Sequence, residues 1–114
     1  MAMLGRYRLL VEISTMLLAA ALEVGGDAVI RAGLRSRGLS LVVAGFVVLG
    51  SYGVVVNLLP MDFSKLLGTY VAFFAVVSIL FGKLFFGDAV PTSTWLGLAV
   101  IVLGSAIIQI GRFR

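Results

Sequence analysis

Long apolar runs dominate the chain, and most charged residues stand at their ends. Residues 38–61 and 89–111 carry no charge, and the shorter uncharged run 66–82 lies between Lys65 and Lys83. A helix rises about 1.5 Å per residue, so about 20 residues cross the hydrocarbon of a bilayer. The lysines that flank the short run can extend toward the headgroups along their own side chains. The pattern predicts four membrane-spanning helices, roughly at residues 9–32, 39–59, 64–86 and 92–110.

The connections between these helices are brief. They read "GLRSRGLS", "LLPMDF" and "FGDAVPTS", and each contains glycine or proline, the residues that most often interrupt helices. No linker, low-complexity tract or soluble domain remains outside the four predicted spans. We therefore expect an all-α membrane protein in which residues 1–114 form a single four-helix transmembrane domain.

Composition supports the same class. The chain has 114 residues, of which 61% are hydrophobic and 12% charged, and its mean hydropathy is +1.19. A soluble domain of this length has too little interior to bury so much apolar surface. Cysteine and histidine are both absent from the sequence, which excludes disulfides and thiolate or imidazole metal ligands. Proton chemistry near neutral pH then falls to a carboxyl group, and no nucleophile–base set or metal-ligand cluster suggests an enzyme or a cofactor.

The net charge of +4 comes from basic residues at the segment ends, as expected for contacts with lipid headgroups rather than with nucleic acid. With four spans, five basic residues fall on one side of the membrane and four on the other. The imbalance of Lys and Arg between loops sets the orientation of a membrane protein, and here it is nearly zero. Two interpretations stay open: a weak bias decided by the first loop, or insertion of different copies in both orientations.

Three acids lie on one stripe of the first helix. At about 100° per residue, Glu23 is about 20° round from Glu12, and Asp27 is about 40° beyond Glu23. A charge at membrane depth costs about 2.5–3.5 kcal/mol on insertion scales, so a carboxyl group there is a functional candidate by default. Glu23 is the candidate proton site, whereas Glu12 is close enough to the helix start to reach water. Asp27 can pair with Arg31 one turn later.

Glycines in the last predicted helix suggest assembly. Gly97, Gly104 and Gly111 follow one another at seven-residue intervals and therefore share one side of the helix. Small residues let membrane helices approach closely, although glycine is also common in membrane helices generally. Four helices are too few to enclose a solute path. We therefore expect a homodimer that pairs through these glycines, with the first three helices lining a cavity.

Four features resemble the small multidrug resistance family and the related YnfA-type proteins of the drug/metabolite transporter superfamily. They are the pattern A-x-x-E-V-x-G at residues 20–26, a basic residue eight positions after the acid, "FFGD" at residues 85–88, and the glycines at 97 and 104. The resemblance covers nearly the whole chain. Asp27 departs from the pattern, because multidrug members have a neutral residue there.

The resemblance implies an antiparallel, dual-topology homodimer in a bacterial inner membrane. Glu23 would be the essential carboxyl group, which binds either protons or a cationic substrate. Tyr70 falls where the family places an aromatic residue that contacts substrate, and the glycines of the last helix would form the dimer contact. Guanidinium exporters carry a tryptophan where this chain has Gly25, so that subclass is not favoured.

Three functions remain in view. The first is a proton-coupled exporter of organic cations, with Glu23, Asp27 and Tyr70 as binding residues. The second is a translocator of lipids or lipid-linked substrates from the same superfamily. The third is a membrane subunit that transports nothing and packs against a larger complex.

Overall fold

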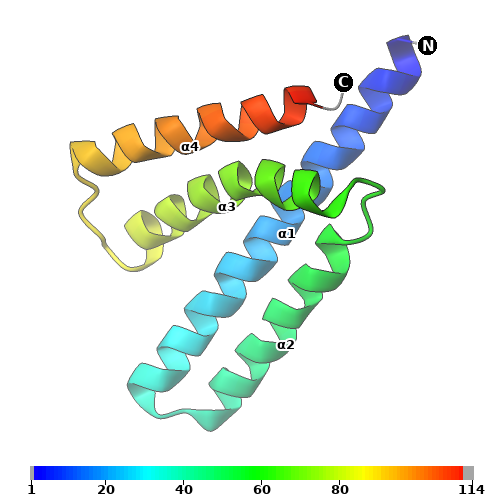
Figure 1. Cartoon of the computed structure of the whole chain (residues 1–114). Coiled ribbons are helices and arrows are strands. Elements are labelled where there is room, and N and C mark those ends of the chain that lie inside the picture. The colour runs from blue at the N-terminus through cyan, green and yellow to red at the C-terminus, as the bar shows by residue number, and fades with distance from the viewer. Residues whose placement is uncertain (1, 112–114) are drawn as a thin grey trace. The chain divides into compact units, whose positions relative to one another are not determined.

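The structure is a computed structural model that describes residues 2–111, with side chains from Gly5 onward. Within those residues it is helical, with no strand, and its elements are α1 (Ala2–Ser36), α2 (Leu39–Val56), α3 (Phe63–Phe85) and α4 (Thr92–Ile110) (Figure 1). Each helix is long and apolar enough to cross a membrane. The predicted all-α fold with four spans is confirmed. The antiparallel dimer stays a prediction.

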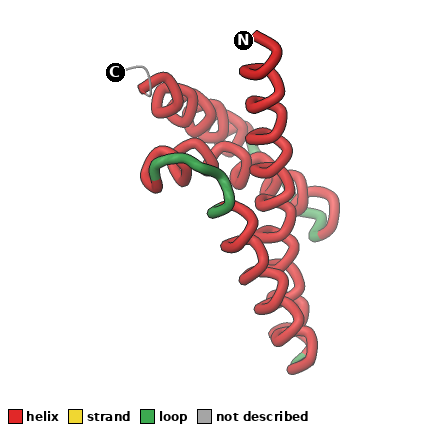
Figure 2. Tube along the Cα trace, turned by 90° about the vertical axis from the view of Figure 1, so that its right-hand side faces the viewer, coloured by secondary structure: helices red, strands yellow, loops and turns green. Residues whose placement is uncertain are grey.

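The helices form two compact units, one made by α1 and α2 and the other by α3 and α4. Each unit is a helical hairpin closed by a short connection, visible as a loop between helices in Figure 2. The single domain expected from the sequence stays a prediction.

The first helix is longer than the predicted 9–32, because α1 runs from Ala2 to Ser36. No proline interrupts this stretch, so the helix continues through the basic residues at both ends. It ends where Arg37 adopts a left-handed backbone with φ 58°, and the Gly38 amide donates to the Gly33 carbonyl at 2.8 Å. This bond belongs to the common helix-ending motif that satisfies the last carbonyls. At 35 residues, α1 is about 50 Å long and exceeds one bilayer crossing.

The helices α1 and α2 pack together at glycines, where their backbones come into direct contact. A Cβ atom added at Gly26 would lie 2.8 Å from the Leu49 amide nitrogen and 3.0 Å from the Gly45 carbonyl oxygen. A Cβ atom at Gly45 would lie 2.9 Å from both the Gly26 carbonyl oxygen and the Ile30 amide nitrogen. The two helix backbones therefore touch, which is the packing that small residues allow where lipid gives no hydrophobic drive.

The second helix ends three residues before the predicted position 59. The Asn57 side chain donates to the Gly53 carbonyl at 2.8 Å, and the Asn57 amide donates to the same oxygen at 3.3 Å. Asparagine competes in this way for the backbone at a helix end, and Pro60 follows without an amide hydrogen to continue the helix.

Polar side chains join the helices of the second hairpin. The Ser105 hydroxyl on α4 donates to the Gly68 carbonyl on α3 at 2.8 Å, and the Thr69 hydroxyl donates to the Gln109 side-chain oxygen at 3.1 Å. Gly68 also receives the Ile108 side chain, whose Cδ1 atom would lie 2.8 Å from an added Cβ. Interhelical hydrogen bonds and close contact thus act together along one stretch of α3 and α4.

The third helix stops at Phe85, one residue before the predicted end, because Gly87 takes a left-handed conformation with φ 66°. The Asp88 amide then donates back to the Gly82 carbonyl at 2.9 Å. After this turn α4 begins at Thr92, with Pro91 as the preceding residue, and it matches the predicted range 92–110.

The glycine contact between α1 and α2 predicts a difference between two equal substitutions in α2. Gly45→Ala should lower the free energy of unfolding by about 1–3 kcal/mol, because its methyl group meets backbone atoms that must move apart. Denaturant unfolding in detergent, followed by circular dichroism, measures the change.

Gly50→Ala is the matched control, because nothing lies within 4 Å of a Cβ atom at Gly50. It should leave stability unchanged or slightly higher, since alanine is the better helix former. Equal stability of the two variants would contradict the backbone contact.

Candidate functional site

Glu23 lies inside the membrane-spanning part of α1. The stretch between Arg8 and Arg31 is about 33 Å long as a helix, which is one crossing of the hydrocarbon. Glu23 precedes Arg31 by eight residues, about 12 Å along the helix axis. Its side chain is half-buried. The structure therefore keeps this carboxyl group away from the helix ends.

The register of the first hairpin places Tyr52 of α2 beside Glu23. Gly26 meets Leu49 and, further along, Gly33 meets Val42, as antiparallel helices require. Three residues back from Gly26 on α1 and three forward from Leu49 on α2 lead to Glu23 and Tyr52.

The Glu23 carboxylate and the Tyr52 phenol are close enough to interact electrostatically, in agreement with this register. Tyr52, like Glu23, is partly buried. Tyr52 could not be identified from the sequence, since nothing in the periodicity of one helix gives its register against another. The phenol offers the carboxyl group a polar neighbour in an otherwise apolar stretch.

The residues of α1 close to Glu23 in sequence include small, buried side chains. Ala19 and Ala20 have no exposed surface, and Val24 is 6% exposed. The same register puts Ala19 level with Val56, which is also fully buried. The part of α1 beside Glu23 thus has small, buried residues.

The other acids of α1 differ from Glu23 in their surroundings. Glu12 is half-buried and lies near the beginning of the spanning stretch, whereas the Asp27 side chain is exposed. Arg31, its predicted ion-pair partner, is exposed too. The roles predicted for Asp27, as a binding residue or as half of an ion pair with Arg31, stay predictions.

Tyr70, the predicted substrate contact, is buried on α3 with 4% of its surface exposed. Its ring centroid lies 6.4 Å from that of Phe74, one turn later on the same helix. Tyr70 and Glu23 belong to different hairpins, and their meeting in one site stays a prediction.

The glycines predicted as the dimer contact are all exposed. A Cβ atom at Gly97, Gly104 or Gly111 would meet nothing within 4 Å, so none of them packs closely within its own hairpin. The close contacts between helices inside each hairpin are made by other glycines, at positions 26, 33, 45 and 68. The glycine side of α4 is therefore available, and its use by a second copy stays a prediction.

No metal site emerges from residues 2–111, where no three histidine, cysteine, aspartate or glutamate side chains gather closely enough to hold an ion. The site's chemistry thus consists of a half-buried carboxyl group, a phenol and small apolar residues within a helical hairpin. The four helices that can each cross a membrane define a multi-pass membrane protein.

The chain belongs to the family described as "Uncharacterised BCR, YnfA/UPF0060 family", whose model matches residues 9–114. It is 34% identical to a UPF0060 membrane protein of Mycobacterium marinum over 86% of this chain and 91% of that protein. It is 37% identical to a UPF0060 membrane protein of Nocardia farcinica over 81% and 85% of the two chains. No solved structure matches it.

These relatives confirm the YnfA-type resemblance and the class of multi-pass bacterial membrane protein. Assignment to the small multidrug resistance family itself stays a prediction.

The location of Glu23 predicts selective chemical labelling. Dicyclohexylcarbodiimide dissolves in the bilayer and modifies the carboxyl groups that it meets there, so it should label Glu23 in preference to carboxyl groups outside the spans. Peptide mass spectrometry identifies the labelled residue. Asp62 and Asp88, exposed in the connections, serve as internal controls and should stay largely unmodified. Labelling of those aspartates to the same extent as Glu23 would show that Glu23 is no more sheltered than they are.

Proposed function

We propose that this protein is a proton-coupled exporter of organic cations, in which Glu23 binds either a proton or the cation. The observation that carries the proposal is a half-buried carboxyl group inside a membrane-spanning helix, with the Tyr52 phenol as its neighbour. An ionisable residue at that depth is expensive and marks an ion or proton pathway in membrane proteins generally. The resemblance to small multidrug resistance proteins supports the same function.

Competition for one carboxyl group couples the two movements. A cation attracted to the Glu23 carboxylate excludes the proton, and a proton that neutralises the carboxyl group removes the charge that holds the cation. A proton gradient then drives release of the cation on the side where protons are abundant. The neutral phenol of Tyr52 can orient its hydroxyl dipole toward the carboxylate, which moderates the cost of ionisation in an apolar stretch.

The proposal includes a homodimer. One chain supplies four helices, and the exposed glycine side of α4 offers a surface on which a second copy can pack closely. Membrane lipids are the other partner. Asp27 and Tyr70 are proposed as further contacts of the cation.

Transport in proteoliposomes tests the proposal. With an imposed proton gradient, the parent protein should accumulate a lipophilic test cation such as tetraphenylphosphonium, and Glu23→Gln should fall to the level of protein-free liposomes. Glutamine keeps the size of the side chain but removes the titratable charge. Asp62→Asn, an equal change at an exposed acid in the connection before α3, should transport like the parent.

Size-exclusion chromatography with light scattering shows whether Glu23→Gln still assembles like the parent. Equal transport by parent and Glu23→Gln would overturn the role of the carboxyl group. If no quaternary ammonium or phosphonium cation moves, and a large partner co-purifies in fixed proportion, the subunit function replaces the exporter. Movement of lipids without cations would favour the lipid translocator.

A further inference from the structure

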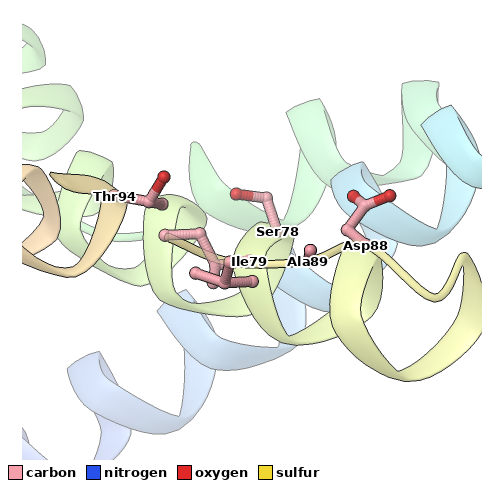
Figure 3. A pocket seen from close by; sticks show the side chains of 6 residues that line it. Ser78, Ile79, Asp88, Ala89 and Thr94 are labelled. Carbon is pink, nitrogen blue, oxygen red and sulfur yellow. The ribbon is translucent and has the colours of Figure 1, made fainter. Parts of the chain in front are cut away.

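A small cavity lies where α3 is connected to α4. Its volume is about 200 Å³, and Figure 3 shows the side chains around it. The lining residues are Ser78, Ile79, Asp88, Ala89, Val90 and Thr94. Because α3 and α4 each span the membrane, their connection lies at the membrane surface, among the lipid headgroups.

The polar groups of the cavity are mostly acceptors. The Asp88 carboxylate accepts only, when ionised. The Ser78 hydroxyl donates its hydrogen to the Ala75 carbonyl at 2.9 Å, so it has lone pairs left for a ligand. The Thr94 hydroxyl can also accept. None of the six lining residues is basic, which leaves the cavity ready for a ligand that donates hydrogen bonds and carries positive charge.

The backbone holds the Asp88 carboxylate in this place. Its amide bonds to the Gly82 carbonyl, and its Oδ2 atom would be 2.5 Å from a Cβ atom at Gly82. The carboxylate thus packs against Gly82 in the last turn of α3. The carbonyls of this turn form the negative end of the helix dipole. An acid at a helix C-terminus is electrostatically unfavourable by itself. A bound cation would remove that cost.

Hydrogen bonding narrows the class of cation. Ile79, Ala89 and Val90 give the cavity apolar walls, and its volume accommodates a small organic group. A primary ammonium group can donate three hydrogen bonds, whereas a trimethylated ammonium group has none to donate. A primary ammonium group on a short carbon stem therefore fits the available acceptors.

The surroundings favour a lipid as the source of this group. Lys83 follows Gly82, and its ammonium lies 5.8 Å from the centroid of the Trp95 ring across the hairpin. Phe85 and Trp95 are exposed, as is typical of aromatic residues at the membrane interface. A lipid phosphate can approach Lys83 while the ammonium group of the same headgroup meets Asp88.

We propose that this cavity binds the ammonium group of a phosphatidylethanolamine headgroup, through Asp88, Ser78 and Thr94. The site is separate from Glu23 and does not depend on cation export. It would anchor the α3–α4 turn at the membrane surface.

Lipid titration of the full-length protein in detergent, followed by native mass spectrometry, tests the proposal. Phosphatidylethanolamine should bind at least about tenfold more tightly than phosphatidylcholine of the same acyl chains, because a charged hydrogen-bonded contact is at stake. Asp88→Asn should remove most of that preference. Asp62→Asn, which neutralises an exposed acid in the other connection, should keep it.

Free ethanolamine, added in competition, separates the two sources of the ammonium group. If it displaces the lipid only at far higher concentration, the lipid assignment is supported. If it binds as tightly as the lipid, the ammonium site stands and the lipid assignment is overturned. Equal binding of the two lipids by the parent protein would overturn the proposal, and that comparison does not depend on how well Asp88→Asn folds.

Discussion

The contact between the backbones of α1 and α2 is the constraint on which the site depends. At Gly26 and Gly45 each helix lacks a side chain, and the other helix occupies the space. Membrane helices gain little from burying apolar surface, so close packing of this kind is their main source of attraction. It also fixes the register, and the register brings Tyr52 to the level of Glu23. A carboxyl group on a separate helix would have no polar neighbour in lipid.

The two hairpins use different means to the same end. The first packs glycine against backbone. The second has a glycine contact at Gly68 and, in addition, interhelical hydrogen bonds donated by the hydroxyls of Ser105 and Thr69. Bonds between membrane helices stabilise by a modest amount each, but they fix which residues meet. The first hairpin thus carries the candidate proton site, and the second joins its helices through the side chains of Ser105 and Thr69.

The sequence predicted the helices well because uncharged runs of spanning length leave few alternatives in lipid. The helix ends were harder to predict, since the left-handed backbone at Arg37 and the hydrogen bond of the Asn57 side chain end two of the helices without changing the hydrophobic pattern. Glu23 was visible as an acid in an apolar run. Tyr52 was not, because a helix's own periodicity carries no information on its partner's register. The regular spacing of the glycines in α4 predicted a helix contact there. The glycines that make contacts between helices inside the hairpins include Gly45 and Gly68, which have no such regular spacing.

In the proposed export cycle, one carboxyl group exchanges a proton for a cation. Proton release on adding tetraphenylphosphonium to the detergent-solubilised protein, in weak buffer near neutral pH, measures this exchange without any transport step. The account predicts release that saturates with the cation in the parent protein and disappears in Glu23→Gln. Binding of the cation with no proton released, or the same release from Glu23→Gln, would contradict it.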